Sequence, residues 1–539
     1  MVARPTNRSK VGVHRDAQTA WLFCPVCGVA APNGLGEHIK LTHGPAVFKN
    51  CVFEAKRSGL SDKEIGKRFG VSLRRLEAIV TEYHGANLSS FVQARPIRSW
   101  RPVDDALETT TVWSFKQRGS WATHNGRYRG NWSPYIPRNI IRRYSRPGEV
   151  VLDYFCGAGT TAVEAKLLGR RCFASDINPN AIELARLNLD FTVPPRETGG
   201  LEIFEPKLSV RDALKLDSFA PQPVDLICTH PPYANIIRYT HSIPGDLSAL
   251  GVEEFLAAMR RIAEMSLAVL KPGGKCAVLI GDTRSRGYVV PLGFRLIRVF
   301  LEAGFRLKEL VIKRQHNCKG SGFWATSSVQ HNFLLLAHEY LPIFERPEEP
   351  AVRDAVYSLA SPIPVNILLR RERLTHRALP EPETTTVWLF PVERMHALTV
   401  QNVLKRYCEA GCVAVTLNES KGTALIWPVG KSLYVRMLFP EEGQGPASIP
   451  PLLQQLRDAV TAVLDRQSPG TFLVVQTKDV RCNGYLEPVA VKLEEMLSLP
   501  RLWLKEIVIV APAGNSSAET VSSGHLDIIH EYLLVYEVR

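Results

Sequence analysis

Short apolar runs alternate with helical patterns of apolar and polar positions along the middle of the chain. The runs that predict strands lie at 149–154, 171–175, 224–228, 276–282, 308–313 and 332–344. Apolar positions at helical spacing predict helices that begin at Ala162 and at Pro291. Strands that alternate with helices are typical of an α/β domain, which we expect over residues 96–345.

Residues 60–83 carry a different pattern, that of two helices joined by a tight turn. Ser61 can cap the first helix, Glu64 completes a capping box, and Gly70 supplies the turn. Ser72 can cap the second helix. The apolar positions expected to face inward are Ile65 and Phe69, then Leu73, Leu76 and Ile79. This arrangement predicts a helix-turn-helix.

Two arginines lie near the start of the second helix, where recognition helices meet base edges or phosphates. We therefore expect Arg74 and Arg75 to point outward and to contact DNA. Further basic residues near them would be directed at phosphates, namely Lys56, Arg57, Lys63, Lys67 and Arg68. The alternative is a helical hairpin with solvated arginines.

Four residues near the N-terminus have the spacing of a structural zinc site. Cys24 and Cys27 are two residues apart, and His38 and His43 follow on a predicted helix, so two thiolates and two imidazoles can enclose a tetrahedral ion. The segment resembles a C2H2 zinc finger, with Leu35 at the position of a core leucine. The spacer is shorter than usual, and Ala31 stands where a phenylalanine is common. The alternative is a chance pair of cysteines with two surface histidines.

The whole-chain composition adds three limits. A chain of 539 residues is too long for one core, and its net charge of +13 favours a polyanionic partner. It has no apolar run of membrane-helix length, and its N-terminus lacks the apolar segment of a signal peptide. The eleven cysteines are scattered apart from Cys24 and Cys27, which suggests a reducing cytoplasm.

The strongest candidate for chemistry is a glycine-containing turn after the first predicted strand, VLDYFCGAGTT at 151–161. Gly157 and Gly159 can let the backbone approach a ligand at a helix N-terminus. Asp176 ends the next strand, nineteen residues after Gly157, which is the distance at which a carboxylate meets ribose hydroxyls in dinucleotide folds. A nicotinamide cofactor would satisfy this pattern equally well.

A second motif, DLICTHPPY at 225–233, decides between these cofactors. In this order the two motifs resemble those of the S-adenosylmethionine (SAM)-dependent DNA amino-methyltransferases, which methylate adenine N6 or cytosine N4. The resemblance implies a Rossmann-like SAM methyltransferase domain. It implies that Asp176 binds ribose, Ile177 packs on adenine and Asp212 binds adenine N6. The other cofactor contacts that it implies are Trp132, Pro134, Asp153, Phe155, Gly157, Gly159 and Thr160.

The same resemblance gives the second motif its chemistry. The first residue of the four, here His230, accepts a hydrogen bond from the target amine, and the carbonyl of Pro231 accepts another. Pro232 follows, and Tyr233 stacks on a base flipped out of the duplex. Asp, Asn or Ser is usual where this chain has His230. A neutral imidazole can accept through one nitrogen and a protonated one cannot, so activity should fall below the pKa of His230.

Beyond a linker at 346–382, the chain repeats itself in a shortened form. Glu108-Thr-Thr-Thr-Val-Trp recurs at Glu383, and His338-Glu-Tyr-Leu recurs at His530. The part missing from the copy should cover the cofactor region 153–212. Matching Leu226-Ile227 to Leu425-Ile426 puts the counterpart of the HPPY motif at Trp427–Gly430. We expect a degenerate methyltransferase half that binds no SAM.

These patterns predict five segments: a zinc finger (1–45), a helix-turn-helix (46–95), the catalytic domain (96–345), the linker (346–382) and the degenerate copy (383–539). The leading hypothesis is a DNA amino-methyltransferase with SAM, a structural zinc ion and double-stranded DNA as its ligands. An RNA methyltransferase and a DNA-bound regulator with an inactive domain are the alternatives. The sequence leaves open the target base and any restriction nuclease partner.

Overall fold

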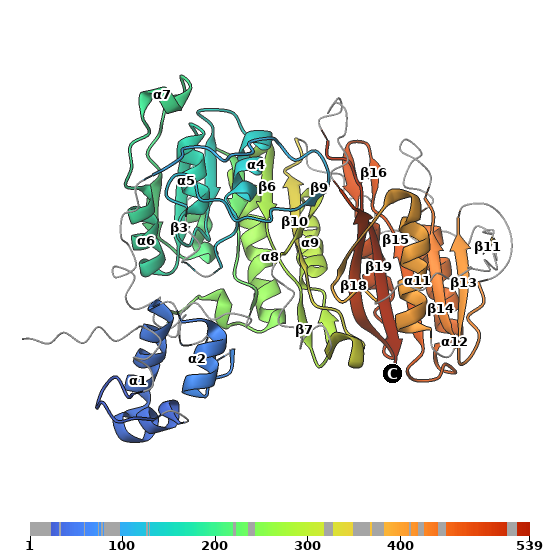
Figure 1. Cartoon of the computed structure of the whole chain (residues 1–539). Helices are drawn as coiled ribbons and strands as arrows, with labels where there is room; N and C mark the ends of the chain where they lie inside the picture. The colour runs from blue at the N-terminus through green and yellow to red at the C-terminus, as the bar shows by residue number, and fades with distance from the viewer. Residues whose placement is uncertain are drawn as a thin grey trace, which may run out of the picture. The chain divides into compact units, whose positions relative to one another are not determined.

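A computed structural model describes most of the chain and divides it into two compact units. The described residues are 23–31, 34–58, 60–73, 75–76, 79, 97–124, 128, 130–218, 223–234, 243–316, 327–348, 367–368, 382–408, 411–418, 425–439, 449–514 and 525–539. One unit, here called the N-terminal unit, comprises Met1–Gln93 with Ile237–Ile243. The main unit comprises the rest (Figure 1). Each is described by itself.

The N-terminal unit is built on a kinked helix, α1 (Leu35–Arg57), and a short helix, α2 (Asp62–Phe69). The kink lies at Gly44, whose φ of 88° cannot continue a helix, and Pro45 follows it. Ser61 and Glu64 form the predicted capping box. Residues of both predicted modules, among them Cys24, Leu35, Ile65 and Phe69, share one hydrophobic core.

The predicted inner face of the following helical segment needs one correction. The backbone is helical at Leu73, Arg75, Leu76 and Ile79. Leu76 and Ile79 are buried as expected, but Leu73 is 55% exposed. Leu73 comes directly after Ser72, at the first turn of the helix, where the chain has not yet turned its side chains toward the core. Arg74 lies outside the described residues.

The first half of the main unit contains an eight-stranded sheet in the order β1-β9-β10-β6-β5-β2-β3-β4. Its strands are β1 (Val112–Trp113), β2 (Val150–Asp153), β3 (Arg171–Asp176), β4 (Lys207–Val210), β5 (Val224–Thr229), β6 (Leu270–Val278), β9 (Arg306–Arg314) and β10 (His338–Glu345). Neighbours pair in parallel, except that β10 runs antiparallel to both β6 and β9. This is the predicted α/β, Rossmann-like fold. The last strand begins at His338, six residues later than predicted.

Alternate residues of the central strands face two layers of helices. Val151 and Leu226 pack with one layer and Leu152 and Ile227 with the other. The first layer is α4 (Tyr135–Tyr144), α5 (Thr160–Leu167) and α6 (Pro179–Leu189); the second is α8 (Val252–Val269) and α9 (Leu292–Glu302). No helix among the described residues has both the length and the apolar character needed to cross a membrane.

The second half of the main unit has a seven-stranded sheet in the order β11-β13-β14-β15-β19-β18-β12. Its strands are β11 (Ile367–Leu368), β12 (Val387–Phe390), β13 (Cys412–Leu417), β14 (Ser432–Met437), β15 (Phe472–Thr477), β18 (Leu502–Pro512) and β19 (Glu531–Val538). Its helices are α11 (Met395–Tyr407), α12 (Ile449–Leu464) and α13 (Val489–Met496).

The two sheets correspond strand by strand over six strands. β12, β18, β19, β15, β14 and β13 take the places of β1, β9, β10, β6, β5 and β2. Residues 418–431 alone connect β13 to β14, whereas residues 154–223 connect β2 to β5 and supply α5, β3, α6 and β4. The copy therefore lacks the elements that carry the cofactor motifs, as the sequence predicts.

The strand register corrects the predicted counterpart of the HPPY motif. Thr229 pairs with Val278 in β6, and Val435 pairs with Val475 in β15. Val278 and Val475 are equivalent because each lies four residues before a buried aspartate that accepts from a β-strand tyrosine. His230 therefore corresponds to Arg436, and Tyr233 to Phe439. Trp427–Gly430 instead lies in the turn before β14, because a two-residue match is too short to fix a register.

The two halves meet through contacts that occur twice. Thr111 Oγ1 lies 2.8 Å from His530 Nδ1, and Thr386 Oγ1 lies 2.9 Å from His338 Nδ1. Two buried glutamates also form ion pairs across the halves, Glu309 with Arg481 at 2.6 Å and Glu506 with Arg284. One hydrophobic core runs through both halves. The main unit thus has the internal pseudo-twofold arrangement of a fused dimer.

Candidate functional site

The glycine turn lies between β2 and α5, as predicted. Gly157 and Gly159 have φ values of 50° and 81°, in the left-handed region that favours glycine. A Cβ atom at Gly159 would lie 3.0 Å from the Cβ of Ala185 on α6, and one at Gly157 would lie 3.0 Å from the ring of Tyr128. Thr160 is buried at the start of α5, and Phe155 is half-buried. Glycine is needed here for both conformation and space.

Two carboxylates hold this turn in place. Asp176 Oδ2 accepts the backbone N–H of Gly157 at 3.0 Å, and its Oδ1 accepts that of Asn178 at 2.9 Å. Asp153 Oδ1 accepts from the Thr229 hydroxyl at 2.7 Å and from the Phe155 N–H at 3.1 Å. Burial raises the pKa of each aspartate to about 6. The Asp153–Thr229 bond joins the end of β2 to the residue before His230.

The predicted adenine contacts lie together on the far side of Asp176. A Cβ atom at Gly245 would lie 2.9 Å from Asp212 Oδ2 and 3.2 Å from Ile177 Cδ1, so one glycine adjoins both residues. Its φ of 89° also requires glycine. Asp212 and Ile177 are half-buried. The sequence analysis did not single out Gly245, because its approach to both side chains depends on the fold.

The segment 128–134 leads into α4 and lies over the glycine turn. Asn131 Oδ1 would lie 3.6 Å from a Cβ atom at Gly157. Trp132 is buried and stacks on His230, with ring centroids 5.4 Å apart and planes 19° apart. Pro134, the residue before α4, lies 3.1 Å from a Cβ atom placed at Gly119. Trp132 therefore contacts the target motif, while Pro134 packs against the preceding loop.

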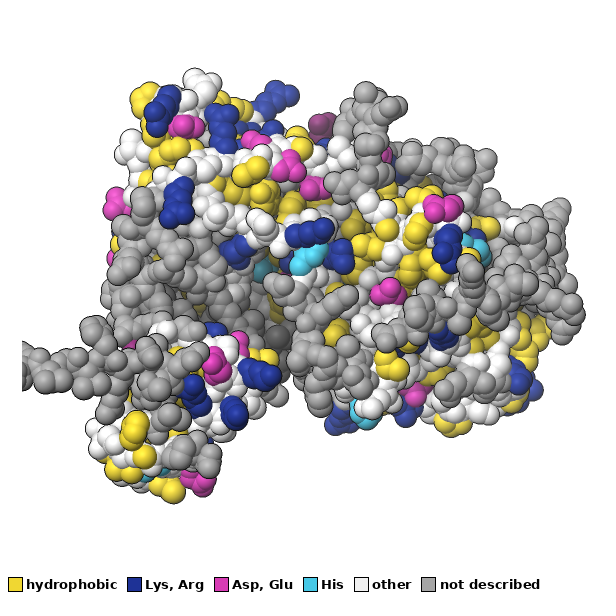
Figure 2. All heavy atoms as spheres, viewed as in Figure 1, with side chains coloured by type: hydrophobic (Ala, Val, Ile, Leu, Met, Phe, Trp, Pro, Cys, Tyr) yellow, Lys and Arg dark blue, Asp and Glu magenta, His cyan; other side chains and the backbone are white. Residues whose placement is uncertain are grey.

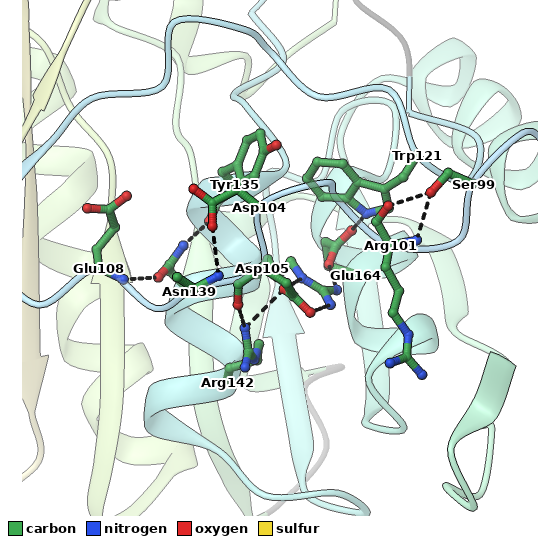
Figure 3. A network of polar contacts seen from close by, with 12 residues as sticks. Ser99, Arg101, Asp104, Asp105, Glu108, Trp121, Tyr135, Asn139, Arg142 and Glu164 are labelled. Atoms are coloured by element: carbon green, nitrogen blue, oxygen red, sulfur yellow. Dashed lines mark hydrogen bonds and ion pairs between the residues drawn. The ribbon is translucent and has the colours of Figure 1, made fainter.

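A polar network anchors α4 to the chain that precedes it (Figure 3). The buried Glu164 accepts from Trp121 Nε1 at 2.7 Å and from Arg138 Nη1 at 2.9 Å. Arg138 also binds Asp105 with both Nε and Nη2, at 2.6 and 2.8 Å, and Arg142 reaches the same carboxylate. Bidentate pairing of this kind fixes orientation as well as distance. The network therefore holds Trp132 in register with the motifs.

The HPPY motif follows β5, directly beside the glycine turn. His230 Nε2 lies 2.7 Å from the Tyr233 hydroxyl, and the two rings meet edge to face at 5.3 Å. Gly281 adjoins the ring of Tyr233, since a Cβ atom there would lie 3.0 Å from Tyr233 Cε2. Pro231 is buried and Pro232 half-buried. His230 and Tyr233 are half-buried as well.

His230 is neutral at physiological pH. Its removal from water lowers the pKa to about 4, because burial disfavours the charged imidazolium. Glu339 and a hydrogen bond with the Gly130 backbone act in the opposite direction, and Lys313 and Arg118 act in the same direction as burial. A neutral imidazole has one acceptor nitrogen, which the role predicted for His230 from the sequence requires.

Two residues at this site were not singled out from the sequence. The Tyr233 hydroxyl donates to Glu339 Oε1 at 2.8 Å, and Lys313 Nζ lies 2.7 Å from Glu339 Oε2. Glu339 is on β10 and Lys313 on β9, where they are cross-strand partners. Only the register of the two strands brings these side chains under the motif.

In the N-terminal unit, the predicted metal ligands lie together. The candidate ligand atoms of Cys24, Cys27, His38 and His43 all lie within 4.8 Å of one another. Cys27 Sγ is 3.2 Å from His38 Nε2, and the buried His43 Nε2 has no hydrogen-bond partner. Two sulfur and two nitrogen donors at this separation fit a tetrahedral zinc ion. The kink at Gly44 directly follows His43.

The same unit presents a basic pocket at the predicted recognition segment. The pocket has a volume of about 420 Å³, and it is lined by Lys40, Pro45, Phe48, Gly70, Val71, Ser72 and Arg75. Arg75 is exposed, and its backbone N–H donates to Ser72 Oγ at 3.2 Å. Lys40 Nζ lies 4.3 Å above the Phe48 ring. Figure 2 shows Lys and Arg side chains on the visible face of this unit.

Comparison with known proteins gives a family for the glycine-turn region. Residues 76–187 match the family described as DNA methylase. The chain is 33% identical over 139 residues to a tRNA (guanine(10)-N2)-dimethyltransferase of Methanothermobacter thermautotrophicus, covering 25% of this chain and 37% of that protein. It is 27% identical over 125 residues to the type II methyltransferase M.BglI of Bacillus subtilis, covering 22% and 36%. The chain thus spans about a third of the length of these relatives.

Solved methyltransferase structures are also similar to part of the chain. The match to TrmN from Thermus thermophilus covers 40% of this chain and 50% of the TrmN chain, at 23% identity and a TM-score of 0.26. Among the relatives by sequence, the type II methyltransferase M2.DpnII of Streptococcus pneumoniae is 31% identical over 93 residues. The match covers 17% of this chain and 34% of that protein. The matched DNA methylase region and the two type II relatives support a DNA amino-methyltransferase family for this part of the chain.

Proposed function

We propose that the chain transfers a methyl group from SAM to an exocyclic amine of a DNA base, adenine N6 or cytosine N4. The observation that carries the proposal is the bond from Thr229 to Asp153 at 2.7 Å, which joins the target motif to the glycine turn. A cofactor on the turn and an amine beside His230 would lie next to each other. Holding two reactants in this way is the main source of rate in a direct transfer.

The residues around the turn fit SAM. Gly157 and Gly159 leave backbone accessible, Asp176 offers carboxylate oxygens at the place of ribose hydroxyls, and Asp212 and Ile177 lie where adenine would be held. Bound SAM would supply an electrophilic methyl group. The protein's own residues bind and orient it, and none of them needs to become a nucleophile.

The target amine would be held by two acceptors, neutral His230 and the carbonyl of Pro231. These two acceptors would bind the N–H groups of the amine, so that the nitrogen lone pair points at the methyl donor. Because they donate no proton, the amine stays uncharged until its nitrogen attacks the methyl group. Tyr233 would stack on the flipped base. Trp132 stacks on the imidazole of His230, with ring centroids 5.4 Å apart, and would help to hold it in place.

DNA is the proposed macromolecular partner, and the N-terminal unit is its proposed reader. The exposed Arg75 and Lys40 beside a pocket suit a phosphate of the backbone, and a helix-turn-helix suits the major groove of duplex DNA. Arg74 was assigned the same role from the sequence. The net charge of +13 supports a polyanion. Replacing Arg75 by Ala should weaken binding and reduce its salt dependence by about one counterion.

RNA is the second candidate substrate, because two relatives are tRNA methyltransferases by their descriptions. A-form RNA has a major groove too narrow for a helix, so the N-terminal unit favours DNA. Methylation of RNA with none of duplex DNA would reverse this order.

We further propose that the Cys24, Cys27, His38 and His43 cluster holds a structural zinc ion. Binding would link the segment at 24–27 to α1 and complete the core shared with α2. Chelation should then release about one zinc per chain and weaken DNA binding, with SAM binding unchanged. A chain purified without zinc that binds DNA normally would contradict the zinc proposal.

The decisive experiment is transfer of labelled methyl from SAM to amplified, unmethylated genomic DNA and to total RNA, followed by nucleoside mass spectrometry. The proposal predicts N6-methyladenine or N4-methylcytosine in DNA, lost in a His230→Ala variant. Label in RNA alone would support the second candidate. SAM binding without label on either would contradict a nucleic-acid methyltransferase.

A further inference from the structure

The Tyr233 hydroxyl lies between a carboxylate and an imidazole and has one hydrogen. It donates that hydrogen to Glu339 Oε1 at 2.8 Å, and its oxygen lies 2.7 Å from His230 Nε2. A hydroxyl that has given its hydrogen to a carboxylate can only accept from the imidazole. The state of Glu339 therefore bears on where the imidazole carries its proton.

Lys313 keeps Glu339 ionised. The two side chains are cross-strand neighbours, with Lys313 Nζ 2.7 Å from Glu339 Oε2. Burial raises the pKa of Glu339, but the charge of Lys313 and its hydrogen bond, with that of Tyr233, hold it below its ordinary value. An ionised carboxylate is a stronger acceptor than a neutral acid, and it cannot donate to the tyrosine in return.

The copy, which lacks the HPPY motif, shows which residues around Glu339 the fold itself retains. Glu531 takes the place of Glu339, but its cross-strand partner is Val510 instead of a lysine. Phe439 replaces Tyr233 and has no hydroxyl, and Arg436 replaces His230. Glu531 accepts instead from the Gln476 amide.

Gly281 also differs between the site and the copy. Gly281 leaves room for the Tyr233 ring, and a Cβ atom there would lie 3.0 Å from it. The equivalent residue in the copy, one before Asp479, is Lys478. The glutamate alone is thus compatible with a structural role, whereas the lysine, the tyrosine hydroxyl and the glycine occur only beside the HPPY motif.

We infer that Glu339 and Lys313 are positioning residues of the target-amine site: the ionised glutamate orients the Tyr233 hydroxyl, which in turn sets which nitrogen of neutral His230 can accept from the amine. The inference rests on the proposed function. It adds to that function a way of fixing which nitrogen of the imidazole carries the proton, at the position where the family usually has the acceptor oxygen of an Asp or Ser side chain.

The test compares variants under saturating SAM and DNA, so that only steps after binding are measured. Glu339→Gln keeps the shape of the side chain but loses its charge, and should lower kcat roughly ten- to hundredfold. Glu531→Gln is the matched control in the copy and should leave kcat unchanged. An unchanged kcat in Glu339→Gln, with an active wild type, would overturn the inference without touching the proposed function.

A double-variant cycle tests whether Glu339 acts through the tyrosine. Tyr233→Phe keeps the stacking ring and removes the hydroxyl. If the glutamate works through that hydroxyl, Glu339→Gln should cost little further activity in the Tyr233→Phe background. An equal loss in both backgrounds would assign Glu339 another role.

The fall of kcat at low pH, here called the acidic limb of the pH profile, gives a further test. Misfolding would lower kcat but would not shift the pH at which it falls. The charged groups facing His230 are Glu339, which favours its protonation, and Lys313 and Arg118, which oppose it. Lys313→Met should therefore move the limb to higher pH, and Lys313→Arg should restore it. Glu339→Gln should move it to lower pH. Shifts of the same sign in Lys313→Met and Glu339→Gln would contradict the arrangement.

Discussion

The half that carries the HPPY motif and its copy share six corresponding strands and differ in the connections between those strands. In both halves a buried histidine bonds a tyrosine hydroxyl at 2.9 Å, and that tyrosine donates to a buried aspartate. Burial lowers the pKa of His338 and of His530 alike, to about 3. These equal features lie at the contact between the halves.

The differences lie at the other end of the sheet. The connection after β2 carries the glycine turn, Asp176 and Asp212, and the connection after β13 carries none of them. The helix α4 has a counterpart in α11, however: Asn139 on α4 accepts from the Glu108 backbone N–H, and Asn402 on α11 accepts from that of Glu383, both at 2.9 Å. The contact between the halves and the helix α11 thus persist in the copy without the glycine turn and its two aspartates.

The largest difference between the halves should appear at His230 and its register counterpart. His230→Ala removes the proposed amine acceptor, and methyl transfer should fall by roughly a hundredfold or more. Arg436→Ala changes the equivalent position in the copy and should leave transfer unchanged. Initial rates with labelled SAM check both. A strong loss in Arg436→Ala would give the copy a direct part in the reaction.

Stability should instead respond equally in the two halves. Glu309 and Glu506 are at most 1% exposed, and each pairs with an arginine of the other half. Glu309→Gln and Glu506→Gln each leave a poorly compensated arginine, and each should cost about 3 kcal/mol of unfolding free energy. Urea unfolding measures this. Glu183→Gln, which breaks an exposed pair on α6, should cost under about 1 kcal/mol.

The binding of SAM should depend on pH through one half only. The pKa of Asp153 and of Asp176 is about 6 in the free protein, and SAM needs the ionised form of Asp176. Affinity should therefore hold above pH 6 and fall by up to about tenfold per pH unit below it. Calorimetry across this range tests the slope. Asp176→Asn should bind more weakly at neutral pH and lose less affinity on acidification.

The smallest effects on stability should again be equal in the two halves. The Tyr288 hydroxyl donates to Glu537 at 2.9 Å, and the Tyr485 hydroxyl donates to Glu345 in the equivalent place. Tyr288→Phe and Tyr485→Phe should each lower the unfolding free energy by about 1 kcal/mol. Thermal unfolding resolves a difference of that size. Unequal losses would show that the two contacts have diverged.

Much of the site could be predicted because its signals are local. The conformation at Gly157 and Gly159 and the strand-end position of Asp176 follow from a few adjacent residues. The cluster of Cys24, Cys27, His38 and His43 could be predicted for the same reason, since the spacing of these residues brings them together. The His-Glu-Tyr-Leu and Glu-Thr-Thr-Thr-Val-Trp repeats likewise identified the copy.

The rest depends on register and burial, which a local pattern does not contain. Lys313 and Glu339 meet only because β9 and β10 pair in one register. The pKa of His230 follows from its burial against Trp132, which lies about a hundred residues earlier in the chain. The same limit explains the misplaced counterpart at Trp427–Gly430, where the strand pairing of β14 was needed to reach Arg436.

The most direct test of a single working site beside a structural copy is the stoichiometry of SAM binding to the full 539-residue chain. Calorimetry should give one SAM per chain, abolished by Asp176→Ala and unaffected by Arg436→Ala. Two sites per chain, or binding that survives Asp176→Ala, would contradict the division between the two halves.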